Sequence, residues 1–252
     1  MSLLARRVTA RNVAQARFWF PWEPLARTLR LSRTPMKQSL LAALTAAALS
    51  LGIPAAAPAA EISIANSGVV SQPSCPVSPC AVISRTTAIQ IKDSNDSGPF
   101  KIRRDGSIRS WSVPLALPSP GEIHYFDKHE GGTARAALAV LRHVGGLDYR
   151  LEALSPVVHL QPDFGTTASV RLADPIRVVK GEVLALAVPT WLPALALDYP
   201  ATTSWRASRS SSQCSDVAVQ TMQSLVGSAA AYGCLYQTAL ITYGAIEHVR
   251  SS

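Results

Sequence analysis

The chain has 252 residues, and 24 Lys and Arg against 16 Asp and Glu give it a formal net charge of +8. Residues 1–60 hold eight of the basic residues and one acidic residue, and so carry +7 of that charge. Residues 61–252 hold sixteen basic and fifteen acidic residues, which makes them almost neutral. A nucleic-acid-binding domain needs a basic excess gathered on one face. No nucleic-acid partner is therefore expected.

A basic N-terminal extension covers residues 1–35, with seven arginines, one acid and four aromatic residues between positions 18 and 22. Two explanations fit this composition. The extension is a membrane-surface or targeting helix, or translation starts at Met36 and the preceding codons are not used. Neither explanation makes residues 1–35 part of the folded domain.

Residues 36–59 have the pattern of a cleavable signal peptide: Lys37, then an apolar stretch at 40–53, then a zone of alanines and prolines. Cleavage needs small residues at the last and third-last positions, and a cut after Ala59 places Ala57 and Ala59 there. The apolar stretch is shorter than the roughly 20 residues that span a bilayer. The pattern predicts a secreted, extracellular protein without a stable membrane anchor.

The four cysteines are Cys75, Cys80, Cys214 and Cys234, and an even number in an exported chain predicts two disulfides. Three pairings are possible. Cys75–Cys80 with Cys214–Cys234 is preferred because each bond then closes a short loop. A zinc site would need close pairs of Cys or His at both ends, and no histidine adjoins Cys214 or Cys234.

Turn-forming residues recur about every ten to fifteen residues, a spacing typical of an all-β sandwich or barrel. These turns are expected at residues 93–98, 105–106, 118–121, 131–132, 145–146 and 180–181.

The runs between the turns have the periodicity of strands. Residues 148–153 and 167–172 alternate apolar with polar side chains, as half-buried strands do. Residues 183–188 and 194–197 are continuously apolar, which predicts strands buried on both faces. Residues 234–245 are expected to form one closing strand.

Three segments are less clear. Residues 134–142 are rich in helix formers, but their short length between Gly-Gly pairs favours a strand. Residues 215–231 have nearly helical spacing and form either a short helix or an irregular excursion. Residues 60–74 form an N-terminal arm or a first strand, and residues 75–252 form the domain.

Four sequence segments together resemble exported bacterial proteins of unknown function. They are Asp-Gly-x-Ile-x-x-Trp-x-Val at 105–113, Ala-Val-Leu-Arg at 139–142, Ser-Pro-Val-Val-x-Leu at 155–160 and Val-x-Lys-Gly-Glu-Val-Leu-Ala-Leu at 178–186. Those proteins are similar in plan to jelly-roll sandwiches, and the resemblance covers roughly residues 80–245. It implies a single-domain, antiparallel, jelly-roll-like β-sandwich and no activity.

Two clusters could hold a metal, and neither fits well. His124 and His129 lie five residues apart, so on a strand they point to opposite faces, and an exposed charged loop is favoured there. Asp93, Asn95 and Ser97 match the first half of a calcium-binding EF-hand loop. The final ligand position of such a loop holds Arg104 instead of glutamate, so these residues are only a weak calcium candidate. No cofactor is expected.

Aromatic residues offer the strongest binding hypothesis. Trp191 lies between Pro189 and Pro193, Trp205 lies in a polar run, and Tyr199 lies between the two tryptophans. Loop tryptophans can stack on the apolar faces of sugar rings. Core packing is the alternative for both tryptophans, and Trp111 is expected in the core.

No motif indicates catalysis: Gly-x-Ser-x-Gly is absent, the cysteines are assigned to disulfides, and the fifteen acids of residues 61–252 are scattered. A triad is a spatial arrangement, however, and sequence alone does not exclude one. The sequence thus favours a secreted non-catalytic module that binds glycan or a cell-envelope component. The alternative is a secreted hydrolase with an unrecognised active site.

Export predicts a defined mature N-terminus. N-terminal sequencing of secreted protein should give Ala60 or Glu61 as the first residue, because the small residues required for cleavage are Ala57 and Ala59. Cytosolic protein that retains Met36 would contradict export.

Overall fold

The computed structural model describes residues 60–66, 72–76, 80–94 and 96–249. The basic extension, the predicted signal peptide and Asn95 lie outside these residues. Every strand pair in the described part of the chain is antiparallel. No helix in that part is long and apolar enough to cross a membrane.

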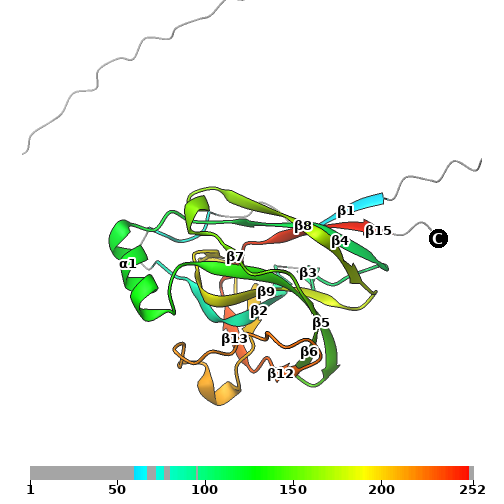
Figure 1. Cartoon of the computed structure of the whole chain (residues 1–252). Helices are drawn as coiled ribbons and strands as arrows, with labels where there is room; N and C mark the ends of the chain where they lie inside the picture. The colour runs from blue at the N-terminus through cyan, green and yellow to red at the C-terminus, as the bar shows by residue number, and fades with distance from the viewer. Residues whose placement is uncertain (1–59, 67–71, 77–79, 95, 250–252) are drawn as a thin grey trace, which may run out of the picture. The chain divides into compact units, whose positions relative to one another are not determined.

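Two sheets make up most of the domain (Figure 1). Sheet A contains, in spatial order, β1 (Ala60–Ala65), β15 (Gly244–Val249), β4 (Gly106–Pro114) and β8 (Thr167–Val178). Sheet B contains, in spatial order, β12 (Ala229–Ala231), β6 (Asp148–Leu154), β5 (Arg135–Gly145), β9 (Val183–Leu192), β2 (Ile83–Asp93), β11 (Ser204–Ala207) and β13 (Cys234–Gln237).

Shorter elements complete the domain. β3 (Asp96–Ser97) pairs with β2, β7 (Val158–His159) pairs with β5, and β10 (Leu195–Ala196) pairs with β14 (Leu240–Ile241). The helix α1 (Pro120–His129) connects β4 to β5. Two 3-10 turns lie at Gln161–Asp163 and Ser211–Gln213.

Eight strands define the connectivity: β1, β2, β4, β5, β6, β8, β9 and β15. Numbered along the chain, sheet A holds the first, eighth, third and sixth of them, and the centre of sheet B holds the fifth, fourth, seventh and second. This interleaving of two antiparallel sheets is the jelly roll. The predicted jelly-roll-like β-sandwich is confirmed.

The main core lies between the two sheets. Trp111 and Ile108 from β4 and Ala245 from β15 belong to one buried cluster with Leu186 and Leu138 from the central strands of sheet B. In β4 the buried side chains alternate with outward-facing ones except between Ile108 and Trp111, where a bulge shifts the period by one residue. Trp111 is therefore a core residue, as expected.

A second core lies on the other face of sheet B. The small side chains of Ala137, Ala139, Ala185 and Ala187 point to that face from β5 and β9, and Tyr232 packs there in the same buried cluster. Alanine leaves room for a large side chain to approach the sheet closely. This explains why β5 and β9 are buried on both faces.

The segment that covers this face is the insertion between β9 and β15, residues 193–243. Its irregular part is fastened by hydrogen bonds: Gln223 donates through its backbone N to Thr87 Oγ1 (3.0 Å) and accepts from Tyr232 Oη (2.6 Å). Burial raises the pKa of Tyr232 well above its ordinary value. Residues 215–231 form no helix and are irregular apart from β12.

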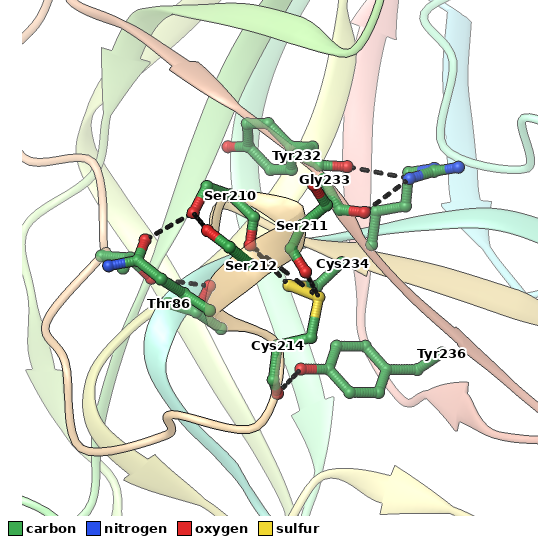
Figure 2. Close-up of a disulfide and its surroundings, with 12 residues drawn as sticks. Thr86, Ser210, Ser211, Ser212, Cys214, Tyr232, Gly233, Cys234 and Tyr236 are labelled. Atoms are coloured by element: carbon green, nitrogen blue, oxygen red, sulfur yellow. Dashed lines mark hydrogen bonds between the residues drawn. A yellow bond between two sulfur atoms is a disulfide. The ribbon is translucent and has the colours of Figure 1, made fainter.

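Both predicted disulfides, Cys75–Cys80 and Cys214–Cys234, are present. Figure 2 shows Cys214–Cys234 joining the irregular part of the insertion to β13. The Tyr236 hydroxyl donates to the carbonyl of Cys214 (2.9 Å), a second tie at the same point.

Two expectations for secondary structure are wrong. The first concerns the segment expected as a turn at residues 118–121 and a charged loop containing His124 and His129, which forms α1 from Pro120 onward. Ser119 caps this helix by accepting from Glu122 N (3.4 Å), and Glu122 Oε2 accepts from Ser119 N (2.6 Å).

Residues 234–245, expected as one closing strand, are divided among β13, β14 and β15. Thr238 lies between β13 and β14 with a positive φ of 59°, which turns the chain from one pairing to the next. The strand favoured for residues 134–142 is confirmed as part of β5.

The two disulfides should differ in their contribution to stability. Replacing Cys214 and Cys234 together by serine should lower the free energy of unfolding by about 3 kcal/mol, because the bond closes the longer loop. The matched Cys75→Ser, Cys80→Ser double variant should lose about 2 kcal/mol. Urea denaturation of the oxidised proteins measures both, and equal losses would contradict loop length as the cause.

Candidate functional site

Trp191, predicted as part of an exposed aromatic platform, has no exposed surface. Its ring packs between Phe126 (centroids 4.9 Å apart) and Phe164 (5.4 Å), and its Nε1 donates to Asp127 Oδ1 (2.9 Å). Trp191 therefore anchors α1 to the core. The platform prediction is wrong here because β9 continues through Pro189, at a bulge where the missing N–H is tolerated.

Trp205 is also buried, with 5% of its surface exposed. It stacks on Tyr236 with ring centroids 4.3 Å apart, as expected for cross-strand neighbours on β11 and β13. Tyr199 is half-buried in the segment between β10 and β11. The ring neighbours of Trp191 and Trp205 differ, so these aromatics do not form one exposed face.

The two metal hypotheses find no support in the described residues. Among them, no group of three His, Cys, Asp or Glu side chains is placed to hold a metal ion. Of the calcium candidates, Asp93 is buried at the end of β2, Ser97 is exposed in β3, and Asn95 lies outside the described residues. In the histidine cluster, Asp127 is occupied by Trp191 and by Gln161 Nε2 (3.2 Å).

The outer face of sheet A carries a sizeable hollow. Two adjoining depressions of about 720 and 470 Å³ share Ser110, Arg171 and Ile246, and together they form what we call the sheet A groove. Sites for small ligands commonly have volumes in this range. Its lining residues are Glu61, Ser63, Ala65, Arg109, Ser110, Trp111, Ser112, Ser169, Val170, Arg171, Leu172, Ala173, Pro175, Gly244, Ala245, Ile246 and His248.

Strand register explains which side chains meet in the groove. Directly paired residues share a face of the sheet. Ser63 pairs with Ile246, Ile246 with Ser110, and Ser110 with Arg171, which makes one row across all four strands.

A second row runs through Ala65, Gly244, Ser112 and Ser169. These side chains are small, so the floor stays low and lined with hydroxyl groups. A side chain at Gly244 would be crowded, because a Cβ would lie 3.2 Å from Ile64 O and 3.3 Å from Ala65 Cβ.

A bulge in β4 gives the groove its charge. Ile108 and Ser110 both pair with β8 and β15, whereas Arg109 between them pairs with neither strand. On a regular strand Arg109 and Ser110 would point to opposite faces. The bulge turns both toward the groove, where both are lining residues.

The neighbouring strand β8 is interrupted at the same level. Arg171 pairs with Ser110 and Ile176 with Ile108, so residues 172–175 lie opposite Arg109 alone. Pro175 in this stretch is tolerated because β8 is an edge strand of sheet A. Residues of this widened ladder line the larger of the two depressions.

The groove has a basic excess. Arg109 and Arg171 are exposed, and within the described residues neither has a carboxylate at salt-bridge distance. Glu61 Oε1 lies 3.2 Å from His248 Nε2, so the lining carboxylate already has a partner. Asp174, in the bulge of β8, does not line the groove.

A serine, a histidine and a glutamate therefore share this groove, but not as a catalytic triad. In a triad the serine is hydrogen-bonded to the imidazole and the acid is buried. No hydroxyl of the described residues is hydrogen-bonded to His248, and the side chain of Glu61 is 65% exposed on an edge strand. The geometry favours binding over nucleophilic catalysis.

A smaller depression of about 380 Å³ lies beside β2 on sheet B, lined by Lys101, His143 and Tyr149 among others. His143 Nε2 is hydrogen-bonded to the carbonyl oxygen of Gly146 (3.0 Å). Burial raises the pKa of Tyr149. Lys101 is the one lysine or arginine among the lining residues of this depression. The sheet A groove is larger and more strongly polar.

Core and groove residues should respond differently to substitution. Trp191→Ala should lower the free energy of unfolding by about 3–5 kcal/mol, because it removes a fully buried ring. Arg109→Gln and Arg171→Gln should each change it by less than about 0.5 kcal/mol, since both side chains are exposed. Chemical denaturation tests this, and a large loss at either arginine would show that it has a structural role.

No family model, no curated protein and no solved structure matches this chain. The chemistry of the sheet A groove is therefore the basis on which a function can be proposed.

Proposed function

We propose that the chain is exported and that its jelly-roll domain is a non-catalytic module which binds a glycan of the cell envelope or surroundings in the sheet A groove. The single observation that carries this proposal is the groove itself, a hydroxyl-lined hollow with two arginines that lack a carboxylate partner in the described residues. The notion of an aromatic platform at Trp191 and Trp205 is abandoned.

The groove suits a sugar chain by its hydrogen-bonding capacity. Serine hydroxyls both donate and accept, as sugar hydroxyls do, and Ser63, Ser110, Ser112 and Ser169 are distributed over three strands. Ile246 adds an apolar contact in the row that contains Ser63 and Ser110. A shallow polar surface of this kind can bind a chain along its length without enclosing it.

Export is supported by the two disulfides, because such bonds persist in oxidising compartments such as the periplasm and the extracellular space. It is supported independently by the signal-peptide pattern at residues 36–59. A secreted binding module needs both properties: delivery outside the cytosol and stability there.

Filling the groove should abolish binding. Ser169→Trp places a large ring on the exposed edge strand β8 and should weaken retention on immobilised polysaccharides at least tenfold, because it occupies the ligand's space. A panel of dextran, β-glucan, polygalacturonate and purified envelope polysaccharide covers neutral and charged chains.

Lys92→Trp is the matched control, since Lys92 is exposed on β2 and lines neither the groove nor the smaller depression. Retention that is unchanged in the Ser169 variant, or equally reduced in the control, would place binding elsewhere and refute the proposed site. Release of reducing sugar by the wild-type protein would favour a hydrolase instead.

A further inference from the structure

We propose that the glycan bound by the sheet A groove is negatively charged and that Arg109 and Arg171 together hold its carboxylate, sulfate or phosphate group. This inference rests on the proposed function and names the ligand class of the same groove. It is carried by the bulge that brings the two arginines to one face.

The first step is the position of the two guanidinium groups. Ser110 lies directly opposite Arg171, and the bulge places Arg109, the neighbour of Ser110, on the same face. Adjacent strands are about 4.8 Å apart, so the two arginines start from neighbouring strands and can reach one anion. Arginine binds such planar or tetrahedral anions through paired N–H donors.

The second step is that these charges are local to the groove. Residues 61–252 hold nearly equal numbers of basic and acidic residues, whereas the groove has Arg109, Arg171 and His248 against Glu61. Glu61 Oε1 already lies beside His248 Nε2, and the two arginines have no carboxylate at salt-bridge distance in the described part of the chain. The excess of positive charge is therefore a property of the groove and not of the whole domain, as expected if it serves to bind a negatively charged ligand.

The third step concerns the class of polyanion. Nucleic acid is bound along basic stripes with many phosphate contacts, and an anionic membrane surface is bound through polybasic clusters or buried apolar side chains. The groove offers two arginines, four serines and a few apolar side chains, of which Ile246 and Val170 are only half-exposed. A glycan that carries one charged group for every few hydroxyl groups fits this set of lining residues best.

The test compares polymers that differ in charge alone. The full-length mature protein is titrated with polygalacturonate and with fully methyl-esterified polygalacturonate, which has the same backbone without the carboxylates. Binding to the charged polymer should be at least tenfold tighter and should weaken as salt is added, because salt screens exposed charges. Arg109→Gln and Arg171→Gln should each weaken it about tenfold.

Arg135→Gln is the matched control: Arg135 is exposed on β5, lines neither part of the groove, and loses the same charge. The charge assignment would be overturned if both polymers bind with equal affinity and the two groove variants do not change that affinity. If Ser169→Trp still abolishes binding, the glycan site itself is left intact. Loss of affinity in all three arginine variants alike would indicate general attraction to polyanions and overturn the inference.

Duplex DNA and vesicles of phosphatidylglycerol are titrated in parallel. If DNA or these vesicles bind as tightly as polygalacturonate, and if that binding depends on Arg109 and Arg171, the groove is assigned to that partner and the choice of a glycan is overturned. Absence of binding to any polysaccharide, charged or neutral, would refute the proposed function together with the inference.

Discussion

The central strands of sheet B are apolar on both faces, and this constraint determines how the rest of the domain is arranged. A strand such as β9, with Leu186 on one side and Ala187 on the other, exposes hydrophobic surface unless both sides are covered. Sheet A covers one side. The insertion at residues 193–243 covers the other, where it is fastened by Cys214–Cys234 and by the buried hydrogen bond between Tyr232 and Gln223.

Because both faces of sheet B are covered at its centre, the outer face of sheet A is the large sheet surface that carries an open groove. Its strands show the complementary pattern: β8 alternates buried Ala168 and Leu172 with exposed Ser169 and Arg171. The same alternation that builds the core therefore supplies the polar lining of the groove. The core and the proposed binding site therefore use opposite faces of the same strands.

Sequence reasoning succeeded where the signal is local. The alternation in β8, the continuous apolar run in β9 and the short loops closed by each cysteine pair depend on neighbouring residues. It missed α1 although the capping box Ser119 and Glu122 is visible in the sequence, because the prolines around it indicated a turn. Trp191 was misplaced because Pro189, read as a strand end, lies at a bulge within β9.

The groove could not be predicted in the same way. Ser63, Ile246, Ser110 and Arg171 come from four strands far apart in the chain, and they form one row because of the jelly-roll strand order. Even with that order known, a regular ladder would place Arg109 facing the core. Ser110 and Ser112 of β4 are near neighbours in the sequence, but the approach of Arg109 and Arg171 to them depends on irregular pairing in β4 and β8 at one level.

The position of β15 has a consequence for how the chain matures. Within the described residues, β1 comes first along the chain and hydrogen-bonds to β15 alone, and β15 comes last of the strands. Pairing between the two ends of a chain is slow, because the intervening loop must first be ordered. Vectorial synthesis therefore leaves sheet A open, with β1 unpaired and the groove unformed, until β15 has been made.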